Sequence, residues 1–130
     1  MNTTILRKLI LATAIGLFSQ FAMAQDDVNA AAVKQIADIV VSLNHFPSDA
    51  DLATLDAISA NSELAQGVRA MANTVASINH SVDEEGVAAM EAIQANSQAP
   101  ERAKVLAGII ATISHSVSDE AKAQLAQLFP

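Results

Sequence analysis

The sequence lacks cysteine, tryptophan and tyrosine, and it has only 7 basic residues against 14 acidic ones. Without cysteine the chain has no disulfide, no thiolate zinc site and no cysteine nucleophile. With 4 phenylalanines as its only aromatics, it lacks the stacking surfaces that single-stranded nucleic acids use. A net charge of −7 argues against a nucleic-acid partner, because few positive charges are available to neutralise phosphates. The 52% hydrophobic content predicts a folded chain.

The first 24 residues have the pattern of a cleaved secretory signal peptide. Arg7 and Lys8 form its positive start, residues 9–18 form an apolar segment, and residues 22–24 read Ala-Met-Ala, a typical cleavage site. The apolar segment is about half of the ~20 residues that a membrane-spanning helix needs. We therefore expect residues 1–24 to be removed on export.

The expected mature chain, residues 25–130, is a single domain with a net charge of −9, because cleavage removes two bases and no acid. Such a chain is predicted to be periplasmic or secreted, with no membrane span after signal cleavage. Since no disulfide can stabilise its fold, the packing of its side chains must do so.

An internal repeat of 35 residues dominates the mature chain. Its only histidines are His45, His80 and His115, and the residues before them recur as Ser-Leu-Asn, Ser-Ile-Asn and Thr-Ile-Ser. The repeat divides the domain into units of about 28–62, 63–97 and 98–130. Repeats of this length are typical of stacked helical pairs. The tetratricopeptide period is close, but the Trp, Gly and Tyr of that pattern are missing.

Each unit is predicted to contain two helices. In the second unit, apolar residues step by 4, 3, 4 and 3 along one helical face: Leu64, Val68, Met71, Val75 and Ile78. A shorter apolar helix follows each histidine, and good N-cap residues stand before it at one repeat position: Ser48, Asp83 and Ser118. The predicted fold is all-α, with three tandem αα-hairpins in a short solenoid or a compact six-helix bundle.

The histidines allow three interpretations. Each follows the last apolar residue of its helix, where imidazole can cap the terminal carbonyls. Each could instead contact a ligand, or serve a metal- or pH-responsive site. Stacked, translated repeats would hold them too far apart to share one ion unless the array closes on itself. A local pairing with the acid four residues on is the remaining option, and it involves Asp49, Glu84 and Asp119.

No motif in the sequence indicates catalysis. Nucleophile-elbow, phosphate-loop and EF-hand patterns are all missing, and we expect neither an enzyme nor a cofactor. The favoured function is an exported module that binds a protein or peptide through a repeated polar edge, formed by Asn44, His45, Asn79, His80, Ser114 and His115. The alternatives are a metal- or pH-responsive protein that uses His45, His80 and His115, and a membrane-surface or self-assembling helical protein.

Overall fold

The fold is all-α, as the sequence predicts. The computed structural model describes residues 27–130, so the expected signal peptide lies outside the described residues. The described chain contains six helices and isolated backbone bridges, but no named strand. Residues 27–42 are helical, and the other helices are α2 (Asp49–Ala60), α3 (Gln66–Ala76), α4 (Glu84–Ala95), α5 (Glu101–Ala111) and α6 (Asp119–Leu128).

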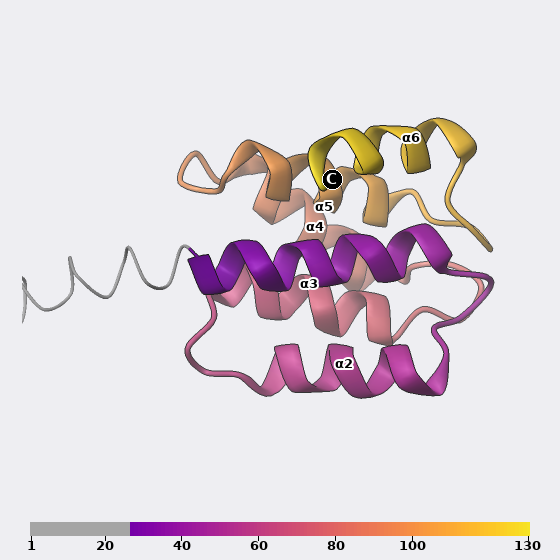
Figure 1. Cartoon of the computed structure of the whole chain (residues 1–130), viewed down its shortest axis with the longest axis horizontal. Helices are drawn as coiled ribbons and strands as arrows, with labels where there is room; N and C mark the ends of the chain where they lie inside the picture. The colour runs from indigo at the N-terminus through magenta and orange to yellow at the C-terminus, as the bar shows by residue number, and fades with distance from the viewer. Residues whose placement is uncertain (1–26) are drawn as a thin grey trace, which may run out of the picture.

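The helices alternate between an inner and an outer set. The inner helices are residues 27–42, α3 and α5, and the outer helices are α2, α4 and α6. Every loop that follows an inner helix lies at one end of the molecule, at the right in Figure 1. The loops that return to the next inner helix lie at the opposite end. The bundle therefore has two distinct ends, and all three histidines lie at the first.

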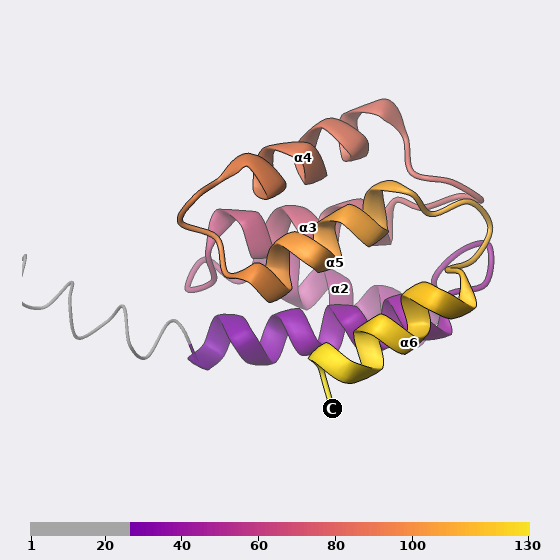
Figure 2. The same cartoon turned by 90° about the horizontal axis from the view of Figure 1, so that it is seen from above.

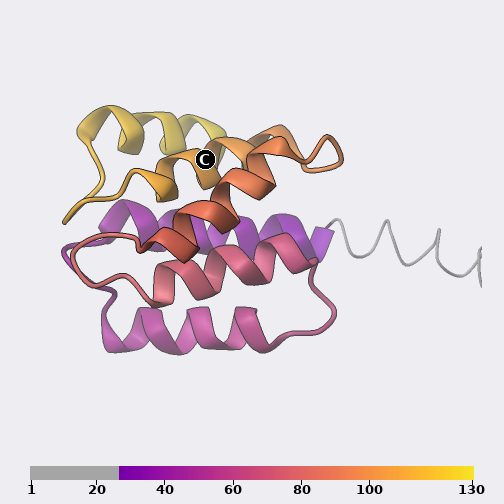
Figure 3. The same cartoon turned by 180° about the vertical axis from the view of Figure 1, so that it is seen from behind.

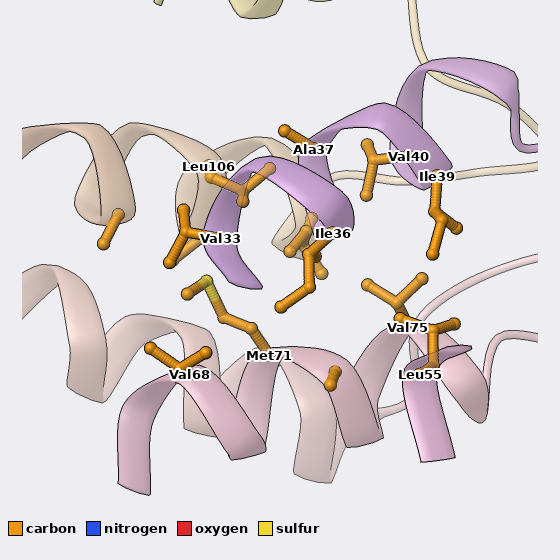
Figure 4. Close-up of a cluster of buried hydrophobic side chains, with 14 of the residues drawn as sticks. Val33, Ile36, Ala37, Ile39, Val40, Leu55, Val68, Met71, Val75 and Leu106 are labelled. Carbon is orange, nitrogen blue, oxygen red and sulfur yellow. The ribbon is translucent and has the colours of Figure 1, made fainter. Parts of the chain in front are cut away.

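The core is built from layers whose members stand 35 residues apart. One layer contains Ile36, Met71 and Leu106, and the next contains Val40, Val75 and Ile110; all six are almost fully buried. Figure 4 shows Ile36, Met71 and Leu106 turned toward the interior between the helices. The smallest side chains, Ala37, Ala72 and Ala107, are also buried, and they let the inner helices approach one another closely. The predicted apolar stripes are thus the core.

α4 packs chiefly against the inner helix that comes after it, and α2 also packs closely on the inner helix that follows it. α2 packs on α3, and α4 packs on α5, more extensively than α3 packs on α4. Among α2 to α6, the tightest helical pairs therefore cross the unit boundaries expected from the sequence. This offset leaves α6 without a following inner helix, and leaves residues 27–42 without a preceding outer one.

The two unpaired helices meet, and so the array is closed. α6 lies beside residues 27–42 (Figure 2), and a shallow hollow between them is lined by Ala37, Val41, Leu125 and Phe129. Leu125 and Phe129 are buried there. Of the two predicted forms, the molecule therefore has the compact six-helix bundle. Its repeats are related by rotation about a central axis. Figure 3 shows the other side of the same arrangement, where α4 runs diagonally between α3 and α5 and in front of the helix of residues 27–42.

The outer helices begin with side-chain caps. Ser48 accepts a hydrogen bond from the Asp51 N–H, Asp83 from the Gly86 N–H, and Ser118 from the Ala121 N–H. Such caps satisfy backbone donors that the first helical turn leaves free. They also fix where each histidine-bearing loop ends. Within residues 27–130, no helix combines the length and the apolar character that crossing a bilayer would require.

Candidate metal centre

The three histidines have a backbone conformation that no other described residue shares. His45, His80 and His115 have φ angles of 67°, 71° and 67°, in the left-handed region, and they are the only described non-glycine residues with positive φ. This conformation costs an ordinary residue about 1–2 kcal/mol. Three repetitions of it at one repeat position mean that the same sharp turn is built three times.

The backbones of these turns are joined in a closed ring of three hydrogen bonds. The His45 N–H donates to the His115 carbonyl (2.5 Å), the His80 N–H donates to the His45 carbonyl (2.7 Å), and the His115 N–H donates to the His80 carbonyl. The bond between His45 and His115 joins the first unit to the third. The ring is therefore the backbone counterpart of the closure made by α6.

The ring of turns brings the three imidazoles together. Their ring centroids are 5.2–5.4 Å apart, and the ring planes meet edge to face at 60° to 88°. One ring nitrogen from each histidine can be chosen so that the three nitrogens lie within 4.8 Å of one another. Residues separated by 35 and 70 positions in the chain thus form one cluster on the molecular axis.

Neighbouring polar side chains hold two of the rings. The Asn44 Oδ1 is 2.7 Å from the His45 Nδ1, and the Ser114 Oγ is 3.2 Å from the His115 Nδ1. When Nδ1 donates to Asn44, the His45 Nε2 is left with its lone pair free. A partner on one nitrogen fixes which nitrogen binds a metal. Asn79 stands at the equivalent position before His80.

Within residues 27–130, no hydrogen bond from a histidine ring caps a helix end; the ring nitrogens that are bonded face Asn44 and Ser114. The inner-helix carbonyls near the ends are taken by hydroxyl groups three positions earlier, at Ser42, Ser77 and Thr112, which donate to the carbonyls of Ile39, Thr74 and Ile109. One carbonyl near each of these helix ends is thereby bonded to a hydroxyl group. The imidazoles are directed to one another instead.

The pairing of each histidine with the acid four residues later, which the sequence left open, is not seen either. Across residues 27–130, no hydrogen bond or ion pair links a histidine to Asp49, Glu84 or Asp119. These acids are the first residues of α2, α4 and α6, where a negative charge complements the helix dipole.

The separation of the nitrogens is close to what a shared metal ion needs. A tetrahedral zinc ion holds its nitrogen ligands at 2.0–2.1 Å, which places two such nitrogens about 3.3 Å apart. The three nitrogens lie within 4.8 Å, so small rotations about the side-chain torsions suffice. His80 and His115 are exposed and His45 is half-buried, which gives the rings that freedom and leaves the cluster accessible from solvent.

The remaining residues of the predicted polar edge surround the cluster. Asn44, Asn79 and Ser114 are exposed, and each takes part in an isolated backbone bridge at this end of the bundle. Phe46 follows His45 and is 62% exposed, which is unusual for a phenylalanine. Sequence reasoning did not single it out, although it is one of only two aromatic residues in the expected mature chain.

Comparison with known proteins adds no information on this site. No family model, curated protein or solved structure matches this chain.

Proposed function

We propose that this chain is an exported protein that binds one divalent transition-metal ion through His45, His80 and His115. The observation that carries the proposal is that all three histidines of the sequence, from three separate repeats, place ring nitrogens within 4.8 Å of one another. A structural role for these residues would not require three imidazoles to share one point.

The donor set determines which metals fit. Three neutral imidazoles suit Zn²⁺, Cu²⁺ and Ni²⁺, whereas Mg²⁺ and Ca²⁺ prefer oxygen ligands. The chain carries a net negative charge, which raises the concentration of cations near its surface. Three protein ligands with an open fourth position hold an ion that a small molecule or another protein can still reach. Reversible capture of the ion is the function we assign.

The test is a calorimetric titration of zinc into the chain purified after export. The wild-type protein is expected to bind one ion per chain. His80→Asn is the informative variant because asparagine tolerates the left-handed conformation but offers no imidazole. We expect it to lose at least tenfold in affinity, since one of three ligands is removed.

Ser116→Asn provides the matched control, because it places the same side chain on an exposed position of an equivalent loop. It should bind zinc as the wild type does. An affinity that His80→Asn leaves unchanged, while the variant stays folded, would refute the metal site. Binding should also weaken as the pH falls, because protons compete with the metal for the same nitrogens.

A second candidate is the interaction module expected from the sequence, and Phe46 favours it. A large aromatic side chain that is 62% exposed beside Asn44 and His45 is the kind of residue that anchors a protein interface. A photo-reactive amino acid at position 46 should then cross-link a discrete protein or peptide partner in the exported compartment. The same probe at Ala123, an exposed position on α6, should not. Equal labelling from both positions would reject this candidate.

A further inference from the structure

The end of the bundle opposite the histidines contains a second feature, an open cavity of about 640 Å³. It lies between the starts of the three inner helices and reaches Asn29 on the first, Val68 on α3 and Ala103 on α5. The histidines follow the ends of these same helices, so the cavity and the candidate metal centre occupy opposite ends. Its size falls in the range of small-molecule pockets in proteins.

The floor of the cavity is apolar. It is formed by side chains that are buried in the structure: Val33, Val68, Met71, Ile93, Ala103 and Phe129. Val33, Val68 and Ala103 occupy one repeat position. The third unit thus has alanine where the other two have valine, and the shorter side chain leaves space on the α5 side.

The rim is polar and presents hydrogen-bond donors. The Asn29 Oδ1 accepts a hydrogen bond from the Ala65 N–H (2.9 Å), and the Asn96 Oδ1 accepts one from the Gln98 N–H (2.9 Å). With both amide oxygens engaged, each side chain offers a ligand its NH₂ group. Arg102 adds a guanidinium, which carries donors only.

The charge of the lining also favours one kind of ligand. Arg102 is the only charged residue among those that line the cavity, although acids outnumber bases by two to one in the whole chain. The described ion pairs are Lys34 with Asp38 and Lys104 with Glu101, and Arg102 is in neither. A cavity with an apolar floor and donors on its rim fits a molecule with an apolar tail and an anionic head.

We propose that this cavity binds a small carboxylate amphiphile of the fatty-acid type, with its tail on the floor and its carboxylate at Arg102, Asn29 and Asn96. The proposal is independent of the metal centre. It predicts a ligand site in the part of the molecule where the three inner helices begin.

The test uses dodecanoate as the probe, titrated below its micelle concentration into the ¹⁵N-labelled chain purified after export. Saturable shifts are expected for the backbone amides of residues 65–68, 99 and 101–103, and not for those of the histidine loops. Dodecyltrimethylammonium has the same tail with a cationic head, and it should bind more weakly. Arg102→Gln should lower the dodecanoate affinity about three- to fivefold, the size of an exposed ion pair.

Ala103→Leu fills the floor and should lower the affinity at least tenfold. Ala123→Leu makes the same change at an exposed position of α6 and should have no effect. Wild-type binding by Ala103→Leu, or shifts that spread over the surface without saturating, would overturn the cavity as the site. Equal affinity for the two head groups would overturn the assignment of the carboxylate.

Discussion

At the scale of single residues, the histidines combine two demands that seldom coincide. Their backbones must take a left-handed turn, and their side chains must point to a common axis. Spacing in the sequence singles out His45, His80 and His115, and it leaves capping, contact and metal binding open. Their positive φ was not readable from the sequence, because histidine adopts this conformation only a few times more often than other residues do. Nor could local spacing show which atoms each ring would face.

The left-handed turn predicts an unusual order of stability at position 80. Without metal, His80→Gly should be more stable than His80→Ala by about 1 kcal/mol, because alanine at positive φ is strained and glycine is not. Chemical denaturation in the presence of a chelator measures the two free energies of unfolding.

Ser77 supplies the control for this prediction. Its φ is −88°, in the right-handed helical region, so alanine there should be more stable than glycine. If alanine is more stable than glycine at position 80 as well, then the turn described for the histidines is wrong.

At the scale of helices, the sequence predicts most of what is seen. The apolar periodicity marks the buried faces, and the acids and hydroxyls after each histidine loop mark where α2, α4 and α6 begin. The close approach of particular helices is harder to predict from the sequence. It depends on how side chains that are far apart in the sequence fit together in the fold. Gly86 is an example. A Cβ atom added there would lie 2.6 Å from the Val82 Cγ1 and 2.8 Å from the Thr74 Cγ2.

Two of the helical glycines, Gly86 and Gly108, should therefore respond to alanine in opposite ways. Gly86→Ala is expected to lower the free energy of unfolding by about 1–2 kcal/mol, because the β-branched side chains of Val82 and Thr74 are stiff and cannot move aside.

Gly108→Ala meets only the flexible end of Gln94, whose Oε1 would lie 3.2 Å away. It should raise the free energy of unfolding by about 0.5–1 kcal/mol through its higher helix propensity. Thermal unfolding of both variants checks the pair. A gain in stability from Gly86→Ala would contradict the close packing of α3 against α4.

At the scale of the whole molecule, the decisive property is closure. The sequence predicts a solenoid or a bundle without choosing between them, because both bury the same stripes. The choice depends on a contact between the last helix and the first, and no local pattern encodes it. Closure turns three equivalent but separate histidines into one cluster. It also removes the two free ends that an open array would have, so the repeats should unfold together.

Phe129 tests this closure, since it is buried between α6 and the first helix. Phe129→Ala should lower the free energy of unfolding by about 3 kcal/mol, in the range found for buried phenylalanines. It should also weaken zinc binding, because His115 would no longer be held beside His45.

Phe46→Ala makes the same chemical change on a side chain that is 62% exposed. It should change stability by no more than about 0.5 kcal/mol. Equal effects of the two substitutions, measured by thermal unfolding, would mean that α6 does not close the bundle.

The most direct test of the central claim is a two-dimensional nuclear Overhauser spectrum of the metal-free chain. The chain has only three histidines, so the imidazole protons can be assigned without ambiguity. The closed bundle predicts cross peaks between all three pairs of rings, including His45 with His115, whose ring centroids are 5.2 Å apart. An open array would give cross peaks between successive repeats at most. A folded chain without a cross peak between His45 and His115 would contradict the closure and the shared metal site that follows from it.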